Sequence, residues 1–116
     1  MLIIPVLPNK EEAWRRFMQA LQGSHGRAFR IWCRQLDLLV EQVWLYETPG
    51  GTTVVINLTT GDSKAALARL AKMGTPFDRW LRQQILTLHG LDLLKIAQAA
   101  NYSLTSPGSW DDIIIK

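Results

Sequence analysis

The chain contains little cysteine and no long apolar run. Cys33 is the only cysteine, so no disulfide can form within the chain, and this favours a reducing, cytoplasmic setting. The apolar runs are only a few residues long, far below the roughly 20 residues that cross a bilayer. The apolar segment 1–7 also lacks the basic lead of an export signal. We therefore expect a soluble, cytoplasmic protein that does not enter a membrane.

The sequence also lacks the motifs that identify metal or cofactor sites. Its two histidines, His25 and His89, stand far apart, and neither H-x-x-x-H nor C-x-x-C spacing occurs. No Walker loop, G-x-S-x-G motif or dinucleotide fingerprint is present. Cys33 lies on an apolar helical stripe, which predicts an inert core thiol rather than a nucleophile. We expect neither a metal ion nor a cofactor.

Charge of one sign is not concentrated in any run. Thirteen Lys and Arg residues against ten Asp and Glu give a net charge of +3, but they are interspersed, as on solvated helix faces. RRM domains share the element order predicted below and carry stacking aromatics on their first and third strands. The corresponding segments here, 2–7 and 52–59, contain no aromatic residue. No nucleic-acid partner is expected, although the basic helix face of Arg27, Arg30 and Arg34 leaves open an acidic protein partner.

The patterns that are present predict one α+β domain over residues 1–116. The length suits a single domain, and 47% hydrophobic with 20% charged residues is ordinary for a globular protein. Segments rich in β-forming residues and apolar stripes at helical spacing predict the order β, α(α), β, β, α(α), β. The strands are 2–7, 41–48, 52–59 and 111–115, and the helices are 9–22, 27–39, 62–73, 75–89 and 94–100, with a loop at 101–109. This order favours a ferredoxin-like, four-stranded antiparallel sheet with split helices on one face.

Local signals fix several element boundaries. Asn9, with Glu12 three residues later, predicts a capping box that opens the first helix. The run Pro49-Gly50-Gly51 between two β-rich segments predicts a hairpin. The pair Thr75-Pro76 predicts a helix start, and His89-Gly90 predicts the end of that helix.

The predicted strands are apolar on both faces. Val43 and Leu45 point to one side of their strand, while Trp44 and Tyr46 point to the other. Helices can cover only one of these faces, and large exposed apolar patches are uncommon. A second copy of the chain is the simplest cover for the other face, so the strands predict a homodimer through the sheet.

Three segments carry a resemblance to known proteins. They are Glu41-Gln42-Val43-Trp44-Leu45, Pro76-Phe77-Asp78-Arg79-Trp80 and Leu88-His89-Gly90-Leu91-Asp92-Leu93. In these segments the chain is similar to a group of small uncharacterised bacterial proteins, and its element order resembles the dimeric α/β barrels, a ferredoxin-like superfamily. The resemblance implies a fold and a dimer but no activity. Pro5 departs from it, because the first strand of such a sheet is central and proline prefers edges.

Two hypotheses follow for function. The first is a homodimeric protein that is non-catalytic or binds a small ligand. The second is a cofactor-independent, monooxygenase-like enzyme with a cavity between sheet and helices, as in enzymes that share this fold. The candidate ligand-binding residues are Trp44, Tyr46, Asn57, His25 and His89. An enzyme should show a pocket reached by a histidine, whereas a scaffold should fill that space with Ile, Val and Leu.

Each polar candidate also has a structural interpretation. His89 near a helix C-terminus can satisfy terminal carbonyls, and His25 between glycines fits a plain loop residue. Asp78 and Arg82 stand at i, i+4, typical of a surface ion pair. A clamp for a substrate carboxylate through Arg79 or Arg82 is the functional alternative.

Overall fold

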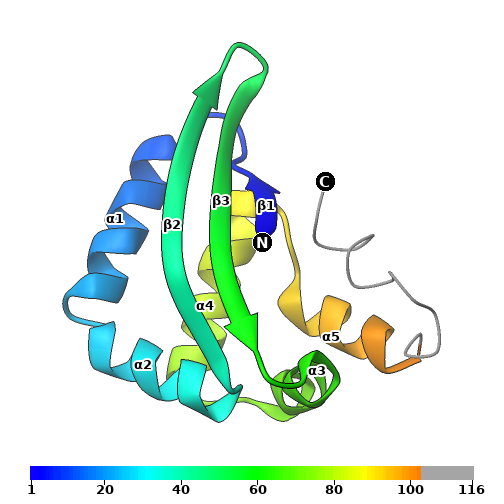
Figure 1. The fold of residues 1–116 in the computed structure, drawn as a ribbon. Coiled ribbons are helices and arrows are strands. Elements are labelled where there is room, and N and C mark those ends of the chain that lie inside the picture. Colours follow the sequence, from blue (N-terminus) through cyan, green and yellow to red (C-terminus); the bar gives the residue numbers. More distant parts are fainter. Residues whose placement is uncertain (103–116) are drawn as a thin grey trace.

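The computed structural model describes residues 1–102, with the backbone alone for residues 99–102 (Figure 1). Eight elements follow one another in this part of the chain. They are β1 (Leu2–Pro5), α1 (Glu11–Gln22), α2 (Gly26–Gln35), β2 (Leu38–Thr48), β3 (Gly51–Thr60), α3 (Ser63–Lys72), α4 (Pro76–His89) and α5 (Leu93–Tyr102). The α+β class is confirmed.

The four-stranded ferredoxin-like sheet is wrong. The described residues form a three-stranded antiparallel sheet of order β1-β3-β2 with five helices. After β3 the chain makes three successive helices, and the segment 111–115 that was predicted as a fourth strand lies outside the described residues. In the described sheet β1 is an edge strand rather than a central one, and Pro5 is its last residue, pairing with Thr53. That position suits a residue without an N–H donor.

The predicted hairpin is confirmed and is longer than expected. β2 begins at Leu38, three residues before the predicted start, and Thr48 pairs with Gly51 across the turn. A bulge between Val40 and Gln42 interrupts the register. Because a bulge adds one residue to one strand, Val40 and Val43 both face the helices despite their odd spacing.

The boundaries of α4 follow the local signals, whereas α2 ends at Gln35 instead of the predicted 39 because β2 begins at Leu38. Thr75 caps α4 by accepting from Asp78 N, Pro76 is its first residue, and Gly90 closes it in the left-handed conformation. The capping box at Asn9 is wrong. Asn9 adopts φ 65, and α1 begins after Lys10 without a side-chain cap. Asparagine tolerates this left-handed conformation in a turn, and the Lys10 amide donates to the Leu7 carbonyl there at 3.2 Å.

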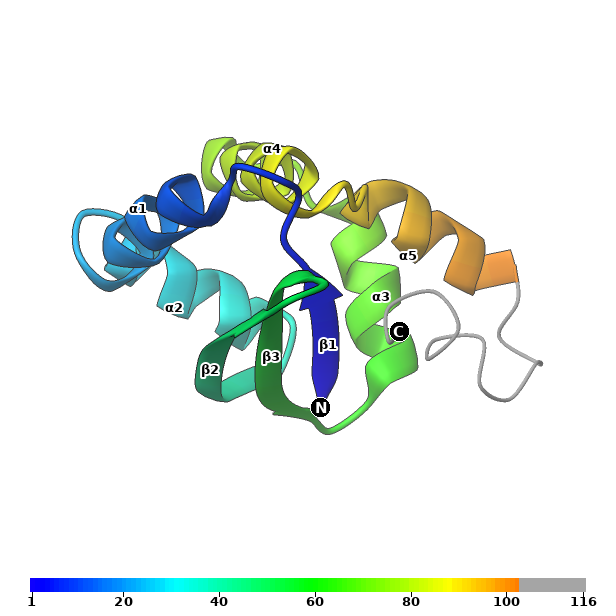
Figure 2. The same cartoon turned by 90° about the horizontal axis from the view of Figure 1, so that it is seen from above.

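The helices cover one face of the sheet, with α3 standing beside its β1 edge (Figure 2). Among them, α2 comes closest to the sheet, against β2, while α3 packs against α5 and α1 and α2 contact α4. Aromatic and aliphatic side chains from these helices and the inner face of the sheet form the core. Its fully buried members include Val54, Leu81 and Leu88. No helix in the described part of the chain is both long and apolar enough to span a membrane.

Candidate functional site

A partly enclosed apolar cavity of about 270 Å³ lies between the inner face of the sheet and the helices. Every strand and every helix contributes to its wall. The sheet supplies side chains such as Val43, Ile56 and Leu58, and α1 and α2 supply Trp14, Phe17, Phe29 and Trp32. Among the residues that the structure describes, no charged side chain lines the cavity. The space is therefore suited to an apolar molecule rather than to an ion.

Incomplete burial of the inner sheet face is the direct consequence of this cavity. Leu38, Val40, Val43 and Leu45 face the helices, yet each remains only half-buried. Ile56, in the central strand of the described sheet, is also only half-buried. A close-packed interior would bury such positions fully. The inner face therefore borders open space that packing has not filled.

Polar side chains are rare in the wall, and His89 is the only ionisable one among the described residues. The others are Thr60 and Ser63, at the end of the cavity where β3 leads into α3. His89 is 8% exposed and sits at the last position of α4. The imidazole therefore lies at the C-terminal end of α4, where this helix meets the sheet.

His89 ties α4 to β1. Its Nδ1 lies 2.8 Å from the carbonyl oxygen of Pro5, and the amide of Leu7 donates to the carbonyl of Leu88 at 2.8 Å. Because a carbonyl only accepts, Nδ1 carries the proton and donates this bond. Burial lowers the pKa of His89 from its usual 6.5, and the bond to Pro5 opposes that shift without reversing it. The ring is therefore neutral near neutral pH.

The lowered pKa predicts a loss of stability in acid. The unfolded chain takes up a proton on His89 near pH 6.5, whereas the folded chain resists that proton. More protons are then bound to the unfolded state, so the free energy of unfolding falls as pH drops below 6.5 towards the lower folded pKa. Urea unfolding of wild type and His89→Asn across this range measures the effect. We expect a shallower pH dependence in the variant, and equal slopes would contradict the assignment.

The other predicted site residues lie away from the cavity. Trp44 and Tyr46 are on the outer face of the sheet, 37% and 55% exposed, and neither lines the cavity. Asn57, which pairs with Gln42, is also absent from the cavity wall. His25 stacks on Trp80 with ring centroids 4.1 Å apart. Of the five candidates, the structure brings only His89 to the cavity.

A buried polar cluster replaces the expected surface ion pair. Asp78 is fully buried, and its Oδ2 accepts from Nε of Arg82 at 2.9 Å. Its Oδ1 accepts from the indole Nε1 of Trp32 at 3.1 Å, which joins α4 to α2. Arg79 Nε donates instead to the carbonyl of Gly74 at 3.0 Å. Both arginines of the hypothetical carboxylate clamp are thus committed to partners within the protein.

Cys33, the single cysteine of the chain, is not activated as a nucleophile. Cys33 is buried on α2, and burial raises the pKa of its thiol to about 11. At neutral pH the thiol is therefore protonated and unreactive.

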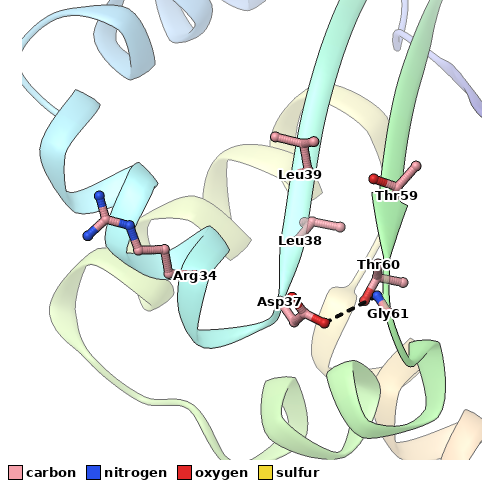
Figure 3. A pocket seen from close by; sticks show the side chains of 7 residues that line it. All are labelled: Arg34, Asp37, Leu38, Leu39, Thr59, Thr60 and Gly61. Atoms are coloured by element: carbon pink, nitrogen blue, oxygen red, sulfur yellow. Dashed lines mark hydrogen bonds between the residues drawn. The ribbon is translucent and has the colours of Figure 1, made fainter.

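A second cavity, more open and of similar volume, lies where β2 begins and β3 ends (Figure 3). The Asp37 carboxylate accepts from the amide of Gly61 at 3.2 Å across it. Figure 3 shows the Arg34 guanidinium extending away from these two residues. Because its polar groups do not converge on a common point, this groove is a poorer ligand site than the apolar cavity.

Within the described residues, no group of three or more His, Cys, Asp or Glu side chains is placed to hold a metal ion. Comparisons of the chain with protein-family models, with curated proteins and with solved structures gave no match. The likeness to the dimeric α/β-barrel superfamily therefore stays a prediction.

Proposed function

We propose that this chain is a small cytoplasmic homodimer that binds a small, uncharged apolar molecule in the cavity between its sheet and its helices. The observation that carries the proposal is the cavity itself, whose wall in the described residues is mostly apolar and contains no charged side chain. Small-molecule sites are typically concave, mostly apolar and supplied with few polar groups. The single ionisable group in the wall, His89, fits that description.

The volume limits the size of the ligand. Apolar cavities of about 150 Å³ stay dry and take up benzene, so one of about 270 Å³ suits a molecule of roughly ten carbon atoms. A fused two-ring hydrocarbon or a short alkyl chain has this size. Transfer of such a molecule from water contributes several kcal/mol, consistent with a dissociation constant on the order of micromolar.

Calorimetric titration with 2-methylnaphthalene tests the binding proposal. We expect saturable binding of one molecule per chain, with the negative heat-capacity change that burial of apolar surface produces. Naphthalene disulfonate, a doubly charged compound with the same ring system, is the matched control and should not bind. An absence of saturable binding by 2-methylnaphthalene would contradict the proposed function.

The outer face of the sheet supports the dimer. Val55 in the central strand of the described sheet pairs with Ile3 on one side and with Trp44 on the other, forming an apolar row across the three strands. The outward positions next to this row in β2 and β3 include the uncharged side chains of Tyr46, Gln42 and Asn57. A symmetric interface brings the same patch against itself, so an uncharged patch avoids like-charge repulsion. No helix in the described part of the chain covers this face (Figure 2).

Trp44→Glu is expected to convert the dimer to a monomer, because it places two like charges near the centre of the interface. Light scattering on a size-exclusion column measures the mass. Wild type should show twice the chain mass of 13.2 kDa, and the variant should show the single mass. Gln19→Glu, which adds the same charge on the exposed side of α1, should remain dimeric. A wild-type monomer would overturn the dimer while leaving the cavity proposal intact.

A monooxygenase-like enzyme is the second candidate, favoured by one observation. The neutral imidazole of His89 in an apolar cavity has the character of a general base. Trp44, Tyr46 and Asn57, which that hypothesis placed around the reaction, lie outside the cavity. Oxygen consumption with a bound phenol that is lost in His89→Asn would support the enzyme. Recovery of the bound phenol unchanged would support binding alone.

A further inference from the structure

The hydrogen-bonding state of His89 determines what its second ring nitrogen can recognise. Nδ1 donates to the Pro5 carbonyl, so in the neutral ring Nε2 carries a lone pair and no proton. No group of the described residues forms a hydrogen bond with Nε2. Because His89 belongs to the cavity wall, a ligand that meets this nitrogen must bring a hydrogen-bond donor.

The rest of the wall excludes an anionic head group. In the described part of the chain no lysine or arginine lines the cavity, so a bound carboxylate would lose its hydration without gaining a counter-charge there. The lone pair on Nε2 would also face the lone pairs of the carboxylate. A hydroxyl group meets neither difficulty, because it is uncharged and donates.

The other polar wall residues are too distant to share one small head group. The hydrogen bond of His89 is to Pro5, which pairs with Thr53 on β3. Thr60 lies further along the same strand. The rise of an extended chain places it about 23 Å from Thr53. Recognition of a polar group at the α4 end of the cavity therefore falls to His89.

From this placement we infer that the cavity selects an uncharged ligand with one hydroxyl group, a phenol or a short alcohol, which donates to Nε2 of His89 while its hydrocarbon part fills the apolar space. The inference rests on the proposed function and names the ligand class for the same site. It also gives His89 two separate tasks. Nδ1 donates the hydrogen bond that links α4 to β1, and Nε2 accepts a hydrogen bond from the hydroxyl group of the ligand.

Three ligands of matched shape test the inference by calorimetry near neutral pH. They are 2-naphthol, which has a donor, 2-methylnaphthalene, in which a methyl group replaces the hydroxyl, and 2-naphthoate, which is an anion. Two variants separate the tasks of the ring. The amide nitrogen of His89→Asn can replace Nδ1 but offers nothing at the position of Nε2. The longer side chain of His89→Gln carries its amide oxygen towards that position.

The measured quantity is the ratio of the affinities for 2-naphthol and 2-methylnaphthalene. We expect His89→Asn to lower this ratio about tenfold relative to wild type, the effect of one buried hydrogen bond. His89→Gln should retain most of the ratio. The affinity for 2-methylnaphthalene is measured in every variant as the reference, so that any change in the cavity itself cancels in the ratio. In wild type, 2-naphthoate should bind about a hundredfold more weakly than 2-naphthol.

The outcomes separate this inference from the proposed function. An equal ratio in wild type and His89→Asn, or 2-naphthoate binding as tightly as 2-naphthol, would overturn the head-group inference while the cavity still binds. Failure of all three compounds to bind would overturn the proposed function itself.

Discussion

Replacing Asp78 with alanine is expected to lower the free energy of unfolding by about 3 to 5 kcal/mol. The carboxylate is fully buried and accepts from both Trp32 Nε1 and Arg82 Nε. Without it, the indole N–H loses its partner in the core, and the Arg82 side chain, only 20% exposed, keeps a charge that it cannot fully return to water. Urea unfolding followed by circular dichroism measures the loss.

Two further variants control this expectation. Arg79→Ala removes a neighbouring exposed side chain that makes a single hydrogen bond to the Gly74 carbonyl, and its cost should stay within about 1 kcal/mol. Asp78→Asn keeps the shape and one acceptor, so its cost should fall between those of the other two. If Asp78→Ala cost no more than Arg79→Ala, the cluster would have no structural importance.

Ile56→Trp is expected to weaken binding of 2-methylnaphthalene by about 10- to 100-fold, the effect of overpacking a site by a large side chain. Ile56 lines the cavity from the central strand of the described sheet and is only half-buried. An indole at this position therefore occupies space that the ligand needs. Aromatic side chains are also favoured in strands, so the variant should fold.

Thr59→Trp is the matched control. Thr59 is exposed on the same strand, pairs with Leu39 and lies outside the wall of the apolar cavity. It receives the same side chain without filling the cavity, so ligand affinity should not change. Equal loss of affinity in the two variants would place the binding site elsewhere. Unchanged affinity in both would show that the space near Ile56 is not used.

Sequence patterns predicted the elements wherever the signal was local. The Pro49-Gly50-Gly51 turn and the start and end of α4 depend on backbone preferences of a few adjacent residues, and all were confirmed. Asn9 shows the limit of such signals. Asparagine favours both a helix cap and a left-handed turn, and here the backbone bonds that follow β1 select the turn. The four-stranded sheet was wrong because it was inferred from the order of the elements, which does not show which strands pair.

The alternation of β2 was predicted correctly, but its consequence for the site was not. Period two shows that Trp44 and Val43 point to opposite faces, yet it does not say which face the helices cover. The helices cover the face of Val43, so Trp44, Tyr46 and Asn57 fall outside the cavity. The burial of Asp78 was missed for a similar reason. The spacing to Arg82 was visible in the sequence, whereas the Trp32 partner, 46 residues away, was not.

The cavity itself had no signal in the sequence. Its walls carry the same apolar stripes that would fill a close-packed core, and only the separation of the helices from the sheet decides which outcome occurs. His89 could be placed at a helix end, but its contact with Pro5 spans 84 residues. A lone histidine at a helix terminus directly before a glycine cap is therefore a candidate to test against tertiary structure, not a site on its own.

The most direct test of a ligand site between the sheet and the helices is an isotope-filtered NOE experiment on the labelled protein with unlabelled 2-methylnaphthalene. We expect contacts from the ring protons to the methyl groups of Ile56 and Leu81, which line the cavity. We expect no contacts to the methyl groups of Ile3 and Val55, which form the apolar row on the outer face. Contacts confined to Ile3 and Val55 would show that the outer face binds the hydrocarbon, and they would contradict a ligand site between the sheet and the helices.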